Sequence, residues 1–353
     1  MLTTNANDLV HFLLERGLLT AGNIVDGHLT VVPTVRRNNN FSVVCENGPA
    51  YFVKTLLPGS AQAPETLRQE ATLYSLAAAD ETLAPLRELL PLFHFYDPQR
   101  SMLIVEHLRD AKTLAELHAE LGGAMEWVAE TTGRAIARIH RAGAAALPHL
   151  DPRAFRRQPP WALSLHQITP SFGQPGVQLQ TLLLTYPEYA QALDSMRAGW
   201  RVNTVIHGDM KFDNCLMIDR TLKIVDWELA DLGEDLWDVA GLLQNYLYWS
   251  AVTAQSGQAT VTMPFEKLQP SMRALWTAYC DEMSTPEPEA MPRLERCVLY
   301  AAARLLQSVM EMLVVSPVMS AHVALLMQTS LNILRDPAAT AQMILNAEAP
   351  ANA

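Results

Sequence analysis

The stretch that decides the fold runs from Val205 to Asp238 and reads V-I-H-G-D-M-K-F-D-N-C-L-M-I-D-R-T-L-K-I-V-D-W-E-L-A-D-L-G-E-D-L-W-D. It holds three short apolar segments separated by polar residues, which are Thr204–Ile206, Cys215–Ile218 and Leu222–Val225. Short apolar segments with polar boundaries are typical of buried strands. We therefore expect three strands here, with the polar residues in the loops between them.

Three of these polar residues form a set, which is Asp209, Asn214 and Asp226. Phosphoryl transfer needs such groups: one carboxylate accepts the proton of the attacking hydroxyl, and an amide and a second carboxylate hold Mg²⁺ on the nucleotide phosphates. Singly, each would be interpreted as a turn former or helix cap, as Asp219 is in the hairpin between the last two strands. The spacing favours the chemical interpretation for the set.

The pattern H-G-D-x-x-x-x-N, followed by a strand and I-V-D-W-E, resembles the aminoglycoside phosphotransferase and choline kinase family. That resemblance implies an α+β, bilobal protein-kinase-like fold with a small antiparallel-sheet N-lobe and a large, mostly helical C-lobe. It also implies ATP and Mg²⁺ as cofactors. Carried onto this chain, Asp209 is the catalytic base, Asn214 and Asp226 are the Mg²⁺ ligands, and His207 braces the loop backbone.

The first part of the chain predicts a small antiparallel sheet. Gly27–Val35, Phe41–Cys45 and Tyr51–Thr55 have strand patterns, and Asn47-Gly48 between the last two is a strong hairpin signal. Before them, Leu9–Leu19 is amphipathic and predicts a helix that Asn7-Asp8 would cap.

Lys54, near the end of the third strand, matches the strand lysine that grips the α and β phosphates in kinases. The helix expected over Pro64–Ala79 contains Glu70, which by resemblance pairs with Lys54. Glu65 is the rival partner, but it lies in the first turn of that helix, where a carboxylate is favoured in any case.

The loop between the first two strands departs from the kinase pattern, because Arg36–Phe41 contains no glycine. Asn tolerates left-handed backbone, and an arginine can bind a phosphate directly. We therefore expect Arg37 and Asn39 to contribute to nucleotide binding; the alternative is an ordinary polar hairpin loop.

A further hairpin, over Leu92–Tyr96 and Met102–Val105, leads into the segment that resembles the hinge between kinase lobes. By resemblance, the carbonyl of Glu106 and the amide of Leu108 bind the adenine edge. The expected division is residues 1–108 for the N-lobe, 109–348 for the helical C-lobe, and 349–353 for a disordered tail.

The C-lobe is expected to be helical over Thr113–Glu120, Met125–Arg141 and Leu179–Trp200, with Gly143 ending the second of these helices. The proline-rich segment Pro148–Gly176 is either a lid or a plain surface loop. Three acids follow Asp226, namely Asp231, Glu234 and Asp235. They either line a substrate pocket or cap the next helix.

Composition excludes several classes of protein. The formal net charge of −11 argues against nucleic-acid binding and against an anionic membrane surface. None of the four cysteines forms a C-x-x-C pair, so we expect neither a zinc site nor a disulfide framework. The apolar stretch Leu305–Leu326 is interrupted by polar residues and proline, which predicts core helices and no membrane span. We expect a cytoplasmic protein; the sequence does not indicate an oligomeric state.

The phosphate acceptor is less well defined than the reaction. A short segment after Asp226 and a large helical region resemble kinases of small hydroxyl compounds, such as aminoglycosides, choline and amino sugars. Lys211, two residues after the expected base, instead resembles the lysine of Ser/Thr kinases that contacts the γ-phosphate, which keeps a peptide Ser or Thr as a second possible acceptor. A pseudokinase that transfers nothing is the third hypothesis, although Lys54, Asp209, Asn214 and Asp226 are all present.

Overall fold

The computed structural model describes residues 5–26, 28–35, 39–56, 63–121, 125–167, 173–253 and 263–346. Its chain divides into two units, of which the first comprises Met1–Lys112 with Leu216–Ala230 and the second Thr113–Cys215 with Asp231–Ala353. Each unit is described separately below. The residues of the expected tail, 349–353, lie outside the described part.

The first unit is built on a five-stranded antiparallel sheet of order β1-β2-β3-β5-β4. Its strands are β1 (Leu29–Val35), β2 (Asn39–Cys45), β3 (Ala50–Thr55), β4 (Phe93–Asp97) and β5 (Met102–Glu106). Alternate residues of β2 are buried, as the period of two in the sequence predicts. The small antiparallel sheet expected from the sequence is therefore confirmed.

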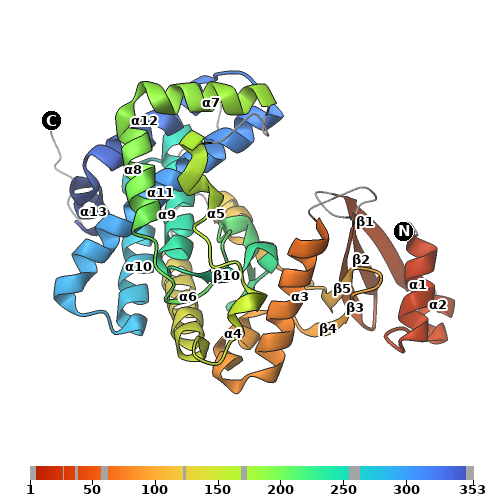
Figure 1. The fold of residues 1–353 in the computed structure, drawn as a ribbon. Helices are drawn as coiled ribbons and strands as arrows, with labels where there is room; N and C mark the ends of the chain where they lie inside the picture. The colour runs from red at the N-terminus through yellow and green to blue at the C-terminus, as the bar shows by residue number, and fades with distance from the viewer. Residues whose placement is uncertain are drawn as a thin grey trace. The chain divides into compact units, whose positions relative to one another are not determined.

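Helices cover both faces of this sheet (Figure 1). On one face, Leu9, Phe12 and Leu13 of α1 (Ala6–Glu15) pack against buried residues of β2 and β3, including Val43 and Val53. On the other face lies α3 (Ala63–Ala79), whose Tyr74 ring stacks on Phe93 of β4. The remaining helical elements of this unit are α2 (Ala21–Val25), η1 (Glu81–Leu83), α4 (Ala84–Leu89) and η6 (Trp227–Leu229).

The first helix differs from the prediction at both ends. Asn5, not Asn7-Asp8, is the N-cap, and its side chain accepts a 2.9 Å hydrogen bond from the Asp8 backbone. The helix ends at Glu15, because Gly17 takes a left-handed conformation (φ 69°) that stops it before Leu19. The apolar spacing identified the buried face correctly, but not the caps.

The second unit is mostly helical, and two short strands lie at its centre. β7 (Thr204–Ile206) pairs antiparallel with β10 (Asp231–Gly233). The described helices of this unit are α5 (Leu114–Leu121), α6 (Glu126–Ala146), α7 (Gly173–Thr185), α8 (Pro187–Ala198), α9 (Leu236–Thr253), α10 (Phe265–Met283), α11 (Glu287–Val315), α12 (Ala321–Arg335) and α13 (Pro337–Leu345). The helix expected over Leu179–Trp200 is thus two helices, since Pro187 begins a new one.

Shorter elements complete the path of the chain. They are β6 (Lys112–Thr113), η2 (Pro152–Ala154), η3 (Trp161–Gln167), η5 (Phe212–Asn214), β8 (Cys215–Ile218) and β9 (Thr221–Ile224). Asp219, in the turn between β8 and β9, adopts a positive φ of 52°, as its predicted role as a turn former requires.

Gly143 does not end a helix, which corrects the prediction. It lies inside α6, which continues to Ala146. A Cβ atom at this position would lie 2.5 Å from Thr204 Oγ1 and 2.7 Å from the Val205 nitrogen. Only glycine therefore lets α6 approach β7 closely enough for the Thr204 hydroxyl to donate a 2.6 Å hydrogen bond to the His140 carbonyl. The glycine marks a packing contact that positions the loop after β7.

Among the described helices, α11 alone is long and apolar enough to cross a membrane by length and composition. In its most apolar window, 61% of the residues are buried inside the protein, as in the core helix of a globular protein. All four cysteines, Cys45, Cys215, Cys280 and Cys297, are buried and carry free thiols.

Candidate active site

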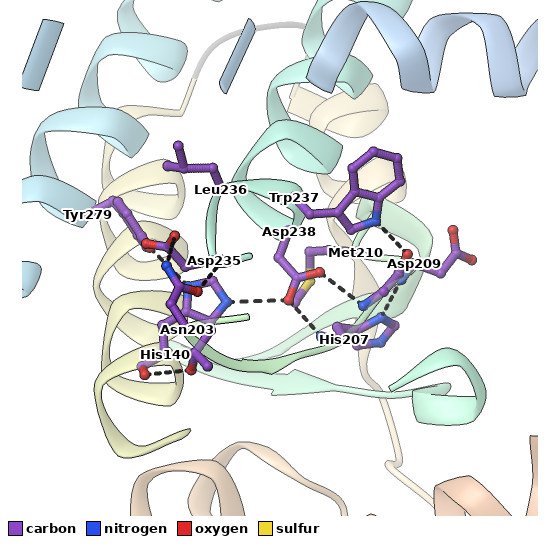
Figure 2. Close-up of polar contacts among 12 residues, drawn as sticks. His140, Asn203, His207, Asp209, Met210, Asp235, Leu236, Trp237, Asp238 and Tyr279 are labelled. Carbon is purple, nitrogen blue, oxygen red and sulfur yellow. Dashed lines mark hydrogen bonds and ion pairs between the residues drawn. The ribbon is translucent and has the colours of Figure 1, made fainter. Parts of the chain in front are cut away.

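The loop from His207 to Lys211 follows β7 directly, and its backbone is held by one buried carboxylate. Asp238, in the first turn of α9, accepts hydrogen bonds from the backbone nitrogens of His207 (2.6 Å) and Gly208 (3.0 Å). Figure 2 shows this carboxylate between the loop and His140, whose Nε2 lies 3.3 Å from it. Because Asp238 is only 1% exposed, these bonds compete little with water and fix the loop firmly.

Two further contacts set the direction of the loop. His207 is fully buried, and its Nδ1 accepts a 3.2 Å hydrogen bond from the Asp209 backbone nitrogen. The Trp237 indole donates a 2.8 Å bond to the Gly208 carbonyl (Figure 2). The contact made by His207 is of the kind expected for a residue that braces the loop backbone.

The Asp209 carboxylate lies between two cations. Lys211 Nζ is 2.6 Å from Oδ2, and an Arg304 nitrogen donates to Oδ1 at 3.3 Å. Burial alone would raise the pKa of Asp209, but Arg304 and Lys211 outweigh it and hold the pKa below its usual range. The carboxylate is therefore ionised at neutral pH, as an acceptor of protons must be.

Asn214 is tied to the same loop. Its side-chain nitrogen donates a 2.9 Å hydrogen bond to the Asp209 carbonyl, and the residue is 5% exposed. This bond fixes the rotation of the amide, so the oxygen is the side-chain atom that points away from the Asp209 carbonyl and can serve a cation.

A cavity of about 620 Å³ opens on Asp209 within the second unit. Its wall combines the charged groups of the loop with aromatic and polar side chains of α9 and residues of α11. The lining residues are Ala115, Asp209, Lys211, Asp213, Gln244, Asn245, Tyr248, Trp249, Arg304, Gln307, Ser308, Glu311, Met312, Val315 and Ser316. This volume suits a ligand the size of a small molecule.

The first unit contains a second charged cluster. Lys54 Nζ lies 2.9 and 2.8 Å from the two carboxylate oxygens of Glu70, and 2.7 Å from Asp226 Oδ1. Burial opposes the positive charge of Lys54, but Glu70 and Asp226 outweigh it and raise its pKa. Burial raises the pKa of Glu70 to about 7, with Lys54 opposing and Asp226 adding to the rise. Glu70, and not Glu65, is thus the carboxylate that pairs with Lys54.

Asp226 has an unusual backbone conformation, with φ 68° and ψ 52°. Asp is one of the few residues that tolerate this left-handed region. The following backbone nitrogen, of Trp227, donates a 3.3 Å bond to Glu70 Oε1, so the turn is tied to the same cluster. The turn places the Asp226 carboxylate on Lys54 and leaves its side chain 38% exposed.

The other residues expected at a nucleotide lie as follows. Arg37 is outside the described residues. Asn39 begins β2, and its carbonyl accepts a 2.6 Å bond from the Thr55 hydroxyl. Glu106 ends β5, and its carboxylate accepts a 3.1 Å bond from the Leu92 backbone nitrogen. Leu108 follows two residues later, outside any helix or strand.

The donors proposed for Mg²⁺ belong to different units, Asn214 to the second and Asp226 to the first. Within the described ranges, no group of three or more His, Cys, Asp or Glu side chains is arranged to hold a metal. Taken separately, each residue offers an oxygen of the kind that Mg²⁺ prefers in proteins, an amide oxygen from Asn214 and a carboxylate oxygen from Asp226.

The three acids expected either to line a substrate pocket or to cap the next helix, Asp231, Glu234 and Asp235, are bonded to other groups of the second unit. Glu234 pairs with Arg296, and Asp235 pairs with Arg293 at 2.5 Å. Asp231 accepts hydrogen bonds from the backbone of Arg157 and Leu232. None of the three lines the cavity beside Asp209.

Sequence reasoning missed two functional candidates. Asp238, which holds the backbone of the loop, was not among the acids singled out from the sequence. Arg304 lies in the middle of an apolar helix, 95 residues from Asp209, and no local pattern marks it. Both became evident only from contacts between distant segments.

Comparisons with known proteins identify the family. A phosphotransferase enzyme family model, named APH, matches residues 28–262, which is about two thirds of the chain. The chain belongs to this family. No curated protein sequence matches it.

Solved structures of kinases share the fold at low sequence identity. A choline kinase from Cryptosporidium parvum Iowa II matches with a TM-score of 0.60 and 10% identity, covering 96% of this chain and 100% of that one. A macrolide 2'-phosphotransferase from Brachybacterium faecium matches at 0.53 and 14%, covering 92% and 97%. An amicoumacin kinase in complex with AMP-PNP, Ca²⁺ and Ami matches at 0.54 and 14%, covering 92% and 93%. The likeness extends over nearly the whole of each chain and bears out the kinase-like fold.

Proposed function

We propose that the protein is an Mg²⁺-dependent ATP phosphotransferase that moves the γ-phosphate to a hydroxyl group of a small cationic molecule. The observation that carries this proposal is the cavity of about 620 Å³ whose wall contains both Asp209 and Lys211. A hydroxyl bound in that cavity would have an ionised carboxylate beside it. Membership of the phosphotransferase family and a neighbour solved with AMP-PNP support ATP as the donor.

In this proposal each residue has a separate task. Asp209 accepts the proton of the acceptor hydroxyl as its oxygen attacks the γ-phosphorus, and the bond from that phosphorus to the ADP oxygen breaks. Lys211 neutralises charge on the transferred phosphate, and Lys54, held by Glu70, binds the α and β phosphates. Asn214 and Asp226 would hold Mg²⁺, which supplies positive charge to the phosphate oxygens when bound.

The cavity wall indicates the class of acceptor. Asp213 and Glu311 supply negative charge, and Tyr248 and Trp249 supply aromatic surface. Carboxylates combined with aromatic faces bind ammonium groups, through ion pairing and cation–π attraction. We therefore propose an acceptor that carries both an amine and a hydroxyl. This cavity lies within one unit and has the volume of a small-molecule site, which favours such a compound over a peptide Ser or Thr.

The test is acceptor-dependent release of ADP from Mg·ATP by the full chain, with formation of the phosphate ester followed by ³¹P NMR. The panel contains hydroxylated amines, the same alcohols without the amine, and Ser- and Thr-containing peptides. Transfer to hydroxylated amines alone is the expected result. Transfer only to peptides would replace the proposed acceptor. If no compound of the panel were phosphorylated, the proposed function would be contradicted.

Glu311→Gln tests the charge of the cavity. We expect KM for a cationic acceptor to rise about tenfold, equivalent to roughly 1.4 kcal/mol of lost binding, with kcat little changed. Glu289→Gln is the matched control, because this exposed acid lies in the first turn of the same helix and outside the cavity lining. Equal KM values for the two variants would contradict a cation-binding role for Glu311.

A further inference from the structure

Arg304 is a buried cation that contacts the Asp209 loop at three points. Its side chain is 4% exposed and comes from α11. The guanidinium donates to Asp209 Oδ1 at 3.3 Å, to the Met210 carbonyl at 3.0 Å and to the Gly208 carbonyl at 3.3 Å. Its carbon also lies 5.1 Å from the centre of the Trp237 ring. A group held by so many contacts has one position.

The space around Arg304 is as restricted as its hydrogen bonds. Gly241 of α9 lies against both the guanidinium and the loop: a Cβ there would be 3.1 Å from Arg304 Cζ and 2.1 Å from the Met210 carbonyl oxygen. Any larger residue would push the helix, the arginine or the loop aside. The α9 backbone at Gly241 therefore packs against both Arg304 and the loop, and this contact helps to fix their positions.

Lys211, the second cation on Asp209, differs in exposure. Its side chain is 37% exposed, and it lies 2.6 Å from Oδ2, the other carboxylate oxygen. A flexible, partly exposed lysine can move to a phosphate, whereas a buried guanidinium fixed by three hydrogen bonds cannot. The two oxygens of Asp209 are thus unequal: one is held by a fixed partner and the other by a movable one.

We propose that Arg304 is a positioning residue that fixes Asp209 through Oδ1, so that Oδ2 is the oxygen that receives the acceptor proton when Lys211 moves onto the transferred phosphate. This inference rests on the proposed function. In the step, the acceptor O–H bond breaks and its proton passes to Oδ2. The acceptor oxygen bonds to the γ-phosphorus, and the bonding pair between phosphorus and the ADP oxygen leaves with ADP.

Arg304→Ala is the first variant, measured against Arg296→Ala as control. A misplacement of the base by about 1 Å can cost about a hundredfold in rate. We expect kcat to fall about a hundredfold, with KM for ATP and for the acceptor within about twofold of wild type. Added guanidinium at non-denaturing concentration should restore part of kcat, because it can occupy the vacated site. Arg296, on the same helix, donates hydrogen bonds to Glu234, to the Gly199 carbonyl and to Tyr300, so its alanine variant tests the loss of a structural arginine that does not contact the Asp209 loop.

Two further measurements separate positioning from structural damage. Arg304→Lys keeps the charge but cannot form the three-point contact, so kcat should fall while the thermal midpoint stays close to that of Arg296→Lys. In an Asp209→Asn background, loss of Arg304 should have no additional effect on kcat, because the two act as one unit. An equal loss of rate in both backgrounds, or a folded Arg304→Lys enzyme with unchanged kcat, would overturn the inference. No transfer by wild type would overturn the proposed function as well.

Discussion

Asp209→Asn is expected to lower kcat by about 10²–10⁴-fold, the usual contribution of a positioned general base. The amide has the shape of the carboxylate but cannot accept the acceptor proton. Binding of Mg·ATP should change little, because the nucleotide contacts proposed for Lys54 and Asp226 remain. The rate follows from acceptor-dependent ADP release, and the affinity from calorimetric titration with a non-hydrolysable ATP analogue.

Asp281→Asn is the matched control, since this exposed carboxylate near the end of α10 is outside the cavity lining. Its kcat should equal that of wild type. If Asp209→Asn kept more than about a tenth of the wild-type kcat, Asp209 would not be the base. If it lost nucleotide affinity together with kcat, the residue would belong to the nucleotide site.

Asp238→Ala is expected to destabilise the protein by about 3 kcal/mol or more. The substitution leaves two buried backbone donors, of His207 and Gly208, without an acceptor, and each unsatisfied donor costs about 1–3 kcal/mol. It also removes the contact of Asp238 with His140 Nε2, although the Tyr279 hydroxyl remains beside Nδ1. Because the loop carries Asp209, we expect activity to fall even at temperatures at which the variant is still folded.

Chemical unfolding with a common m-value measures this loss. Asp8→Ala is the control, because Asp8 is an exposed acid in the first turn of α1, and its loss removes only about 0.3–1 kcal/mol of helix-dipole interaction. An Asp238→Ala protein as stable as the Asp8→Ala protein would mean that water satisfies the loop donors.

Features that depend on residues close together in the chain could be predicted from the sequence. Alternating burial in β2 and the Asn-Gly hairpin follow from short-range patterns, and so does the left-handed turn at Asp219. The loop motif also brought Asp209 and Asn214 to one loop, and the choice of Glu70 over Glu65 as partner of Lys54 was correct. Each of these depends on neighbours close in sequence or on a motif of fixed spacing.

The sequence was insufficient where distant segments meet. Gly143 has the same local signal whether it ends a helix or allows close packing, and only the approach of β7 decides between them. Glu234 and Asp235 could not be assigned to structural ion pairs until their arginine partners, some sixty residues away, were known. The role of Arg304 depends on a contact between α11 and the loop.

The central claim is tested most directly by thermal unfolding with and without Mg·ATP, in wild type and in Asp226→Asn. Asn tolerates the left-handed backbone of this position, so the substitution keeps the turn and removes the charge, together with the ion pair to Lys54. Asp219→Asn, at another aspartate with positive φ, is the control. At a hundredfold excess over Kd, binding should stabilise wild type and Asp219→Asn by about 2.7 kcal/mol, and Asp226→Asn hardly at all. No stabilisation of wild type would contradict the account and favour a pseudokinase, and an equal shift in Asp226→Asn would place the metal elsewhere.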